Sequence, residues 1–166
     1  CRKPVVFTRK AWGEAELRRR LAACRDKRAA SGAGPLADDA AREVRLQTVY
    51  EIALSGLLAR CRAGESLAPE TEVHGIRLGP IVVLGSPFET FQAIRRDVDA
   101  AAAGPVTLVT SFVNDSVGYA VDTTCAERGG YAADMVPLIC GELPYADSHG
   151  ELVQVLLEID RSLQPA

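Results

Sequence analysis

The sequence predicts an α/β fold, a mixed β-sheet of about four to five strands covered by helices, because strand and helix patterns alternate along the chain. Two short apolar runs, residues 81–84 and 106–109, have the composition of buried strands. Apolar residues at helical spacing occur before, between and after these runs. We expect a single domain portion. Residues 1–67 would form a mainly helical lead-in, and residues 68–166 the sheet, the site-bearing loops and a closing helix.

The composition excludes several classes of protein. The 166 residues suffice for one domain with a core, and 48% hydrophobic and 25% charged residues are ordinary for a globular protein. A formal net charge of −3 argues against a nucleic-acid-binding surface, and no apolar run approaches the length of a membrane-spanning helix. The five cysteines are widely spaced and odd in number, so we expect mostly reduced, buried thiols.

The first part of the chain is mainly helical. After an extended lead-in with a short strand-like run, residues 14–30 place Leu17, Leu21 and Cys24 at helical spacing. The opposite, arginine-rich face is typical of a solvated helix surface, with an anion-binding or membrane-surface patch as the alternative. The segment SGAGP at residues 31–35 predicts a loop, and a second helix runs from Asp38 or Asp39 to about residue 62.

The second part carries the predicted sheet. Residues 71–78 alternate as a strand and turn through Gly79-Pro80 into residues 81–84, which are apolar on both faces, as in a sheet covered on both sides. A helix follows Glu89 to about residue 103, and residues 106–112 return to the sheet.

The C-terminal part predicts a loop or edge strand over residues 134–140 and then a core helix that closes the domain. The helix would begin with a capping box, in which Ser148 is the cap and Glu151 reaches back to it.

Polar residues follow each of the two apolar strands. Glu89 comes just after Gly85-Ser86-Pro87, and Tyr119 lies in the polar loop after the second strand. Binding sites of open α/β sheets lie at this edge. The simpler interpretations are a first-turn glutamate stabilised by the helix dipole, worth up to about 1 kcal/mol, and a half-buried tyrosine ring.

Three ordered pieces carry a family resemblance: GSPFETF at residues 85–91, NDSVGY at 114–119 and GGY at 129–131. In their order and spacing they resemble the neutral/alkaline, zinc-dependent ceramidase-like family, over roughly the last hundred residues. The resemblance implies that the chain is the C-terminal portion of a larger catalytic domain. It departs from the family at Phe88, where many relatives carry glycine, and at Ala132, where ceramidases carry glutamate.

The resemblance also implies site residues and a reaction. Glu89 and Tyr119 would be zinc ligands, and Tyr131 would contact the scissile amide. The reaction would be hydrolysis of an N-acyl bond in a small molecule or lipid by metal-activated water. Neither histidine, His74 nor His149, is well placed, so the missing ligands would come from a histidine-bearing N-terminal half, present as a separate chain or a cleaved segment.

Two alternatives remain open. Cys1 could be an N-terminal nucleophile with its own amine as base, although Arg2-Lys3-Pro4 supplies no further acid or base. The chain could instead be a non-catalytic relative that keeps the scaffold as a binding or assembly subunit, which Ala132 and the missing histidines favour.

Overall fold

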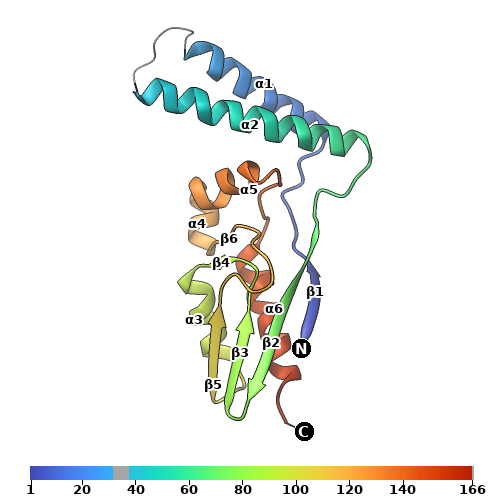
Figure 1. The fold of residues 1–166 in the computed structure, drawn as a ribbon, viewed down its shortest axis with the longest axis vertical. Coiled ribbons are helices and arrows are strands. Elements are labelled where there is room, and N and C mark those ends of the chain that lie inside the picture. Colours follow the sequence, from blue (N-terminus) through green and yellow to red (C-terminus); the bar gives the residue numbers. More distant parts are fainter. Residues whose placement is uncertain (32–37, 166) are drawn as a thin grey trace.

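The computed structural model describes residues 1–31 and 38–165, and its centre is a mixed four-stranded sheet with the order β1-β2-β3-β5 (Figure 1). The neighbouring pairs β1–β2 and β2–β3 are antiparallel, and β3–β5 is parallel. The strands span Arg2–Val6 (β1), Glu70–Leu78 (β2), Ile81–Gly85 (β3) and Val106–Thr110 (β5). The predicted α/β class and mixed sheet are therefore confirmed, and the strand-like run near the start of the chain belongs to the sheet.

Six α-helices, a π-helical turn and a second small sheet complete the described residues. The helices are α1 (Glu14–Ala30), α2 (Asp38–Arg62), α3 (Gln92–Ala101), α4 (Thr123–Arg128), α5 (Val136–Ile139) and α6 (Ser148–Ser162), and the π-helical turn η1 is Tyr131–Met135. The small sheet pairs β4 (Glu89–Thr90) with β6 (Tyr119–Ala120). None of the described helices is long and apolar enough to cross a membrane.

Helices α3 and α6 cover one face of the central sheet and form the main core with it. Alternate strand residues such as Val73, Val82 and Leu84 are fully buried there against Leu156 and Ile159 of α6. Helix α6 approaches β2 so closely that a Cβ at Gly75 would overlap the Ile159 side chain. The absence of a side chain at this position therefore sets the distance between helix and sheet.

The other face of the central sheet is apolar but uncovered among the described residues. Strand register aligns two rows of side chains across β2, β3 and β5. These rows, called the open face below, are Ile76, Val83 and Leu108, and Leu78, Ile81 and Val106. Five of the six side chains are more than a third exposed. The expectation that both faces of β3 would be covered is wrong for this chain, because the described helices pack on one side only.

The α1–α2 hairpin lies across one end of the molecule, beyond α5 (Figure 1). Its own small core joins Leu17, Leu21 and Leu54 to Leu138 and Leu143. Both predicted helices are confirmed, and the predicted loop at residues 31–35 lies outside the described residues except for Ser31.

Three local predictions are wrong. Residues 131–139 form η1 and α5 rather than a loop or edge strand, with a buried Pro137 near the start of α5, where a missing N–H costs nothing. The cap of α6 is Asp147, whose carboxylate accepts from the Gly150 amide at 2.8 Å, so Ser148 and Glu151 do not form a capping box. The helix after Glu89 begins only at Gln92, so Glu89 is a strand residue and not a first-turn helix residue.

Candidate functional site

Glu89 and Tyr119 are direct neighbours in the parallel pair β4–β6. The Glu89 amide donates to the Gly118 carbonyl at 2.9 Å, and the Phe91 amide donates to the Ala120 carbonyl at 3.0 Å. Residues that are paired in register extend their side chains from the same face of a sheet. The two residues selected from the sequence, thirty positions apart, are therefore brought together beyond the end of β3.

Phe88 and Ser86 fix the direction of the Glu89 side chain. Phe88 is fully buried and packs edge-on against Phe7 and Tyr145, with ring centroids 4.9 and 5.2 Å away. Since successive strand side chains point to opposite faces, Glu89 is directed outward and is exposed. The buried Ser86 hydroxyl accepts from the Phe88 amide at 3.1 Å and pairs with the Thr90 hydroxyl at 3.1 Å, which holds the turn.

The Tyr119 ring lies between two other aromatic rings. Its centroid is 6.1 Å from that of Phe91 and 6.2 Å from that of Tyr131, in edge-on arrangements. Tyr131 is 61% exposed, so its hydroxyl is free to meet a ligand. All three residues predicted for the site, Glu89, Tyr119 and Tyr131, thus lie in one cluster.

Two glycines and one carboxylate orient Tyr131. Gly129 and Gly130 have φ values of 70° and 100°, a region that residues with a side chain rarely adopt, and they turn the chain into η1. The Asp134 carboxylate accepts from the Gly130 amide at 3.0 Å and forms an ion pair with Lys10 at 3.0 Å. Sequence reasoning missed Asp134 and Ser86. The GGY motif, with an acid three residues later, was the available signal for Asp134.

Electrostatic coupling links the three site residues. Hydrogen bonding with the Glu89 carboxylate raises the pKa of the Tyr119 phenol above its ordinary value, and desolvation and the neighbouring Tyr131 act in the same direction. In this state the phenol keeps its proton at neutral pH. A cation held between the two oxygens would reverse the shift, because it stabilises phenolate.

The site offers a metal ion two oxygen donors from this chain. A carboxylate and a phenol suit a zinc ion chemically, but a zinc site has three or four protein ligands. Across residues 1–31 and 38–165, no group of three His, Cys, Asp or Glu side chains could hold a metal ion. The donor set fits zinc only as part of a larger set.

Of the two histidines, only His149 has hydrogen-bond partners among the described residues. His74 lies on β2, and its buried Nε2 atom is 3.4 Å from the Glu72 carboxylate without a hydrogen bond. His149 pairs with Asp97 at 2.7 Å, and its Nδ1 atom accepts from the Thr123 amide at 3.2 Å, so it stabilises the start of α4.

The remaining polar residues of the loop after β5 are structural. Asn114 donates to Glu72 at 3.2 Å and Asp115 accepts from Thr71 at 3.2 Å, so both tie the loop to β2.

The cysteines are free thiols, but only Cys125 is buried, so the expectation of mostly buried thiols is wrong. Cys125 belongs to the small cluster against which the Tyr119 ring packs. At the chain start, the Cys1 amine donates to the Gly75 carbonyl at 2.7 Å, which ties the terminus to β2.

This geometry can bind a cation through two oxygens and can present one exposed tyrosine hydroxyl to a bound molecule. Comparisons of the chain with protein-family models, with curated proteins and with solved structures give no significant match.

Proposed function

We propose that this chain is one portion of a zinc-dependent amide hydrolase of the ceramidase-like kind, cleaving an N-acyl bond. The observation that carries the proposal is the direct pairing of Glu89 with Tyr119, with Tyr131 beside them. The resemblance selected these three residues from separate motifs. Chance would not be expected to bring them into one exposed cluster.

Each of the three residues has a role in this reaction. Glu89 and Tyr119 would hold the ion from this side, and the exposed Tyr131 hydroxyl would donate to the amide carbonyl as negative charge develops there. Bound zinc would supply Lewis-acid activation of a water molecule and of the carbonyl. The proton transfers are assigned to a histidine of the partner polypeptide, because His149 is held by Asp97 and Thr123 and His74 lies on β2 beside Glu72.

The histidine-bearing partner, in this proposal, covers the open face. Six apolar side chains in two aligned rows form a patch of the kind that marks a protein interface. The loop after β5 links this patch to the site, because Val113 folds over Gly85 at the end of β3 and the chain then continues to Tyr119. A layer packed on the open face would therefore reach the Glu89–Tyr119 site, where it could supply the histidine ligands that the proposed zinc site still needs.

Phe112 strengthens the link between the open face and the site. It has a positive φ of 57°, which is costly for a bulky residue, and yet its side chain is 53% exposed. Its amide donates to the Phe88 carbonyl at 3.2 Å, next to Glu89. An aromatic ring held in solvent at the expense of backbone strain is best explained by a partner or substrate that contacts it.

The test supplies the missing histidine ligands as free imidazole. Tyrosine-selective NMR would follow the Tyr119 pKa in the 166-residue chain with zinc and imidazole. We expect zinc to lower the raised pKa of Tyr119, and Glu89→Gln to abolish that effect, whereas Glu127→Gln at an exposed position of α4 should not. If zinc leaves the Tyr119 titration unchanged in the wild-type chain, the metal-binding proposal fails.

A second candidate is a non-catalytic assembly subunit, which the open face and Ala132 favour. It predicts a partner without metal binding, so the same zinc titration separates the two candidates. The remaining alternative, a Cys1 nucleophile, predicts that Cys1→Ser abolishes hydrolysis while Glu89→Gln does not.

A further inference from the structure

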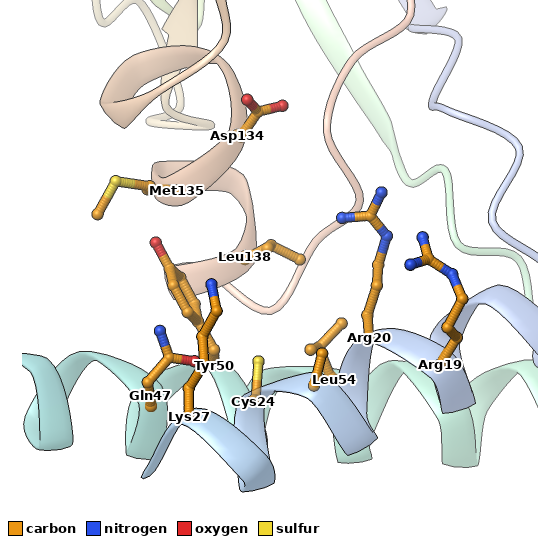
Figure 2. Close-up of a pocket in the computed structure, with 11 residues that line it drawn as sticks. Arg19, Arg20, Cys24, Lys27, Gln47, Tyr50, Leu54, Asp134, Met135 and Leu138 are labelled. Atoms are coloured by element: carbon orange, nitrogen blue, oxygen red, sulfur yellow. The ribbon is translucent and has the colours of Figure 1, made fainter. Parts of the chain in front are cut away.

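A groove separates the α1–α2 hairpin from the η1–α5 segment. Its volume is about 270 Å³, slightly below the range of roughly 300–1,000 Å³ for sites that hold drug-sized ligands. Figure 2 shows Arg20, Lys27 and Tyr50 extending from the hairpin toward Asp134 and Met135 on the opposite wall. The groove therefore has room for a ligand smaller than a typical drug.

The hairpin side of the groove is positively charged. Arg19 and Arg20 share the Glu16 carboxylate, at 2.7 and 2.6 Å, and Lys27 forms no ion pair with the side chains that the structure describes. On the opposite wall, Asp134 is already neutralised by Lys10. An anion entering between the walls would thus meet more positive than negative charge.

Apolar side chains form the floor of the groove and part of its far wall. Leu54 and Leu138 are buried where the hairpin core meets α5, with Cys24 and Met135 beside them. Tyr50 adds a hydroxyl, and burial raises its pKa to about 12, so it is a proton donor at neutral pH. Apolar surface next to the Lys27 ammonium group and a phenol donor suits a ligand with one acidic end and a short hydrocarbon body.

We propose that the groove between the hairpin and η1 binds small amphipathic organic anions, with the acidic group on Lys27 and Tyr50 and the hydrocarbon body over Leu54 and Leu138. This goes beyond the proposed hydrolase, and it gives part of the arginine-rich face of α1 a binding role.

The groove also shares a wall with the candidate site. Tyr131 begins η1 and Asp134 and Met135 end it, so one five-residue turn carries both the exposed tyrosine and the far wall of the groove. A ligand in the groove would contact the turn that orients Tyr131.

The chain contains two natural probes of this groove. Its single methionine, Met135, lines the groove, and its single tryptophan, Trp12, stacks under the Arg20 guanidinium at 3.6 Å. Octanoate would be titrated into the 166-residue chain carrying ¹³C-methyl methionine, with Trp12 fluorescence as a second readout. Two control compounds are compared with octanoate. Octanol has the same hydrocarbon chain but no charge, and acetate has the charge but almost no hydrocarbon chain.

We expect octanoate to shift the Met135 resonance saturably, with a Kd of about 1 mM or below, and octanol and acetate to have much weaker effects. Lys27→Gln should weaken octanoate binding about tenfold, because it removes a charged donor. Arg28→Gln removes a neighbouring charge that pairs with Glu51 outside the groove and should leave binding unchanged. Equal weakening by both variants, equal binding of acetate or octanol, or no saturable shift of Met135 would overturn the proposal. None of these outcomes depends on zinc binding at Glu89.

Discussion

The two faces of the central sheet have nearly the same apolar character but very different surroundings. On one face Val73, Val82 and Leu84 are fully buried beneath α3 and α6. On the other, Ile76 and Leu108 are 54% and 45% exposed although their side chains are equally apolar. The comparison teaches that apolar strand composition does not decide which face of the sheet is covered, since the described helices pack on one face only.

The largest loss of stability should come from truncating a side chain on the covered face of the sheet. Leu156→Ala removes a fully buried side chain of α6 and leaves a cavity against the sheet, which should lower the free energy of unfolding by about 2–5 kcal/mol. Leu108→Ala on the open face is the matched control and should cost less than about 1 kcal/mol, since its side chain is already half in solvent. Urea unfolding measures both, and equal losses would contradict the difference between the faces.

A smaller loss of stability should follow from adding a methyl group to β2 beneath α6. In Gly75→Ala the new Cβ would overlap the Ile159 side chain and approach Leu163, so helix and sheet must move apart. We expect a loss of about 1–3 kcal/mol in the free energy of unfolding. Gly75→Ala combined with Ile159→Ala should lose less stability than the sum of the two single changes, because the second change removes the Cγ2 atom at the point of overlap. A double variant no more stable than the simple sum of the single changes would indicate that the overlap is not the cause.

The sequence predicted the central sheet well because its signal is local. Alternation in residues 71–78 and the Gly79-Pro80 turn are enough to predict the β2–β3 hairpin. Whether an apolar strand face is covered by its own chain depends on contacts distant in sequence, which periodicity does not encode. This is why β3 was predicted to be covered on both sides.

The residues of the site were predicted from motifs, but the conformation of the backbone that carries them was not predicted. Glu89 looked like a first-turn helix residue, but pairing with β6 holds it in a strand until Phe91. That pairing joins segments thirty residues apart, so no local pattern shows it. The π-helical turn that begins at Tyr131 contains a Met135–Gly130 backbone hydrogen bond and a Gly130–Asp134 side-chain bond, which a propensity argument does not predict either.

A gain in stability is expected at Phe112, where the open face meets the site. Asparagine tolerates a positive φ better than phenylalanine does, and the Phe112 ring loses little burial on removal. Phe112→Asn should therefore raise the free energy of unfolding of the isolated chain by about 0.5–1 kcal/mol. Thermal unfolding measures it. A destabilised variant would mean that the ring packs within this chain, which would remove one argument for a contact at this point.

The smallest effect on folding should come from a charge placed on the open face. Leu108→Lys on β5 leaves the long aliphatic stem of lysine over Val83 and its ammonium group in water, so the free energy of unfolding should change by no more than about 0.5 kcal/mol. The same variant should strongly reduce binding of a hydrophobic dye such as ANS, because it interrupts the row formed by Ile76, Val83 and Leu108. Leu84→Lys on the covered face should instead prevent folding, because the charge would be buried without a partner. A Leu108→Lys chain that unfolds readily would show that this face is packed within the chain itself, and the partner layer would then have no surface to cover.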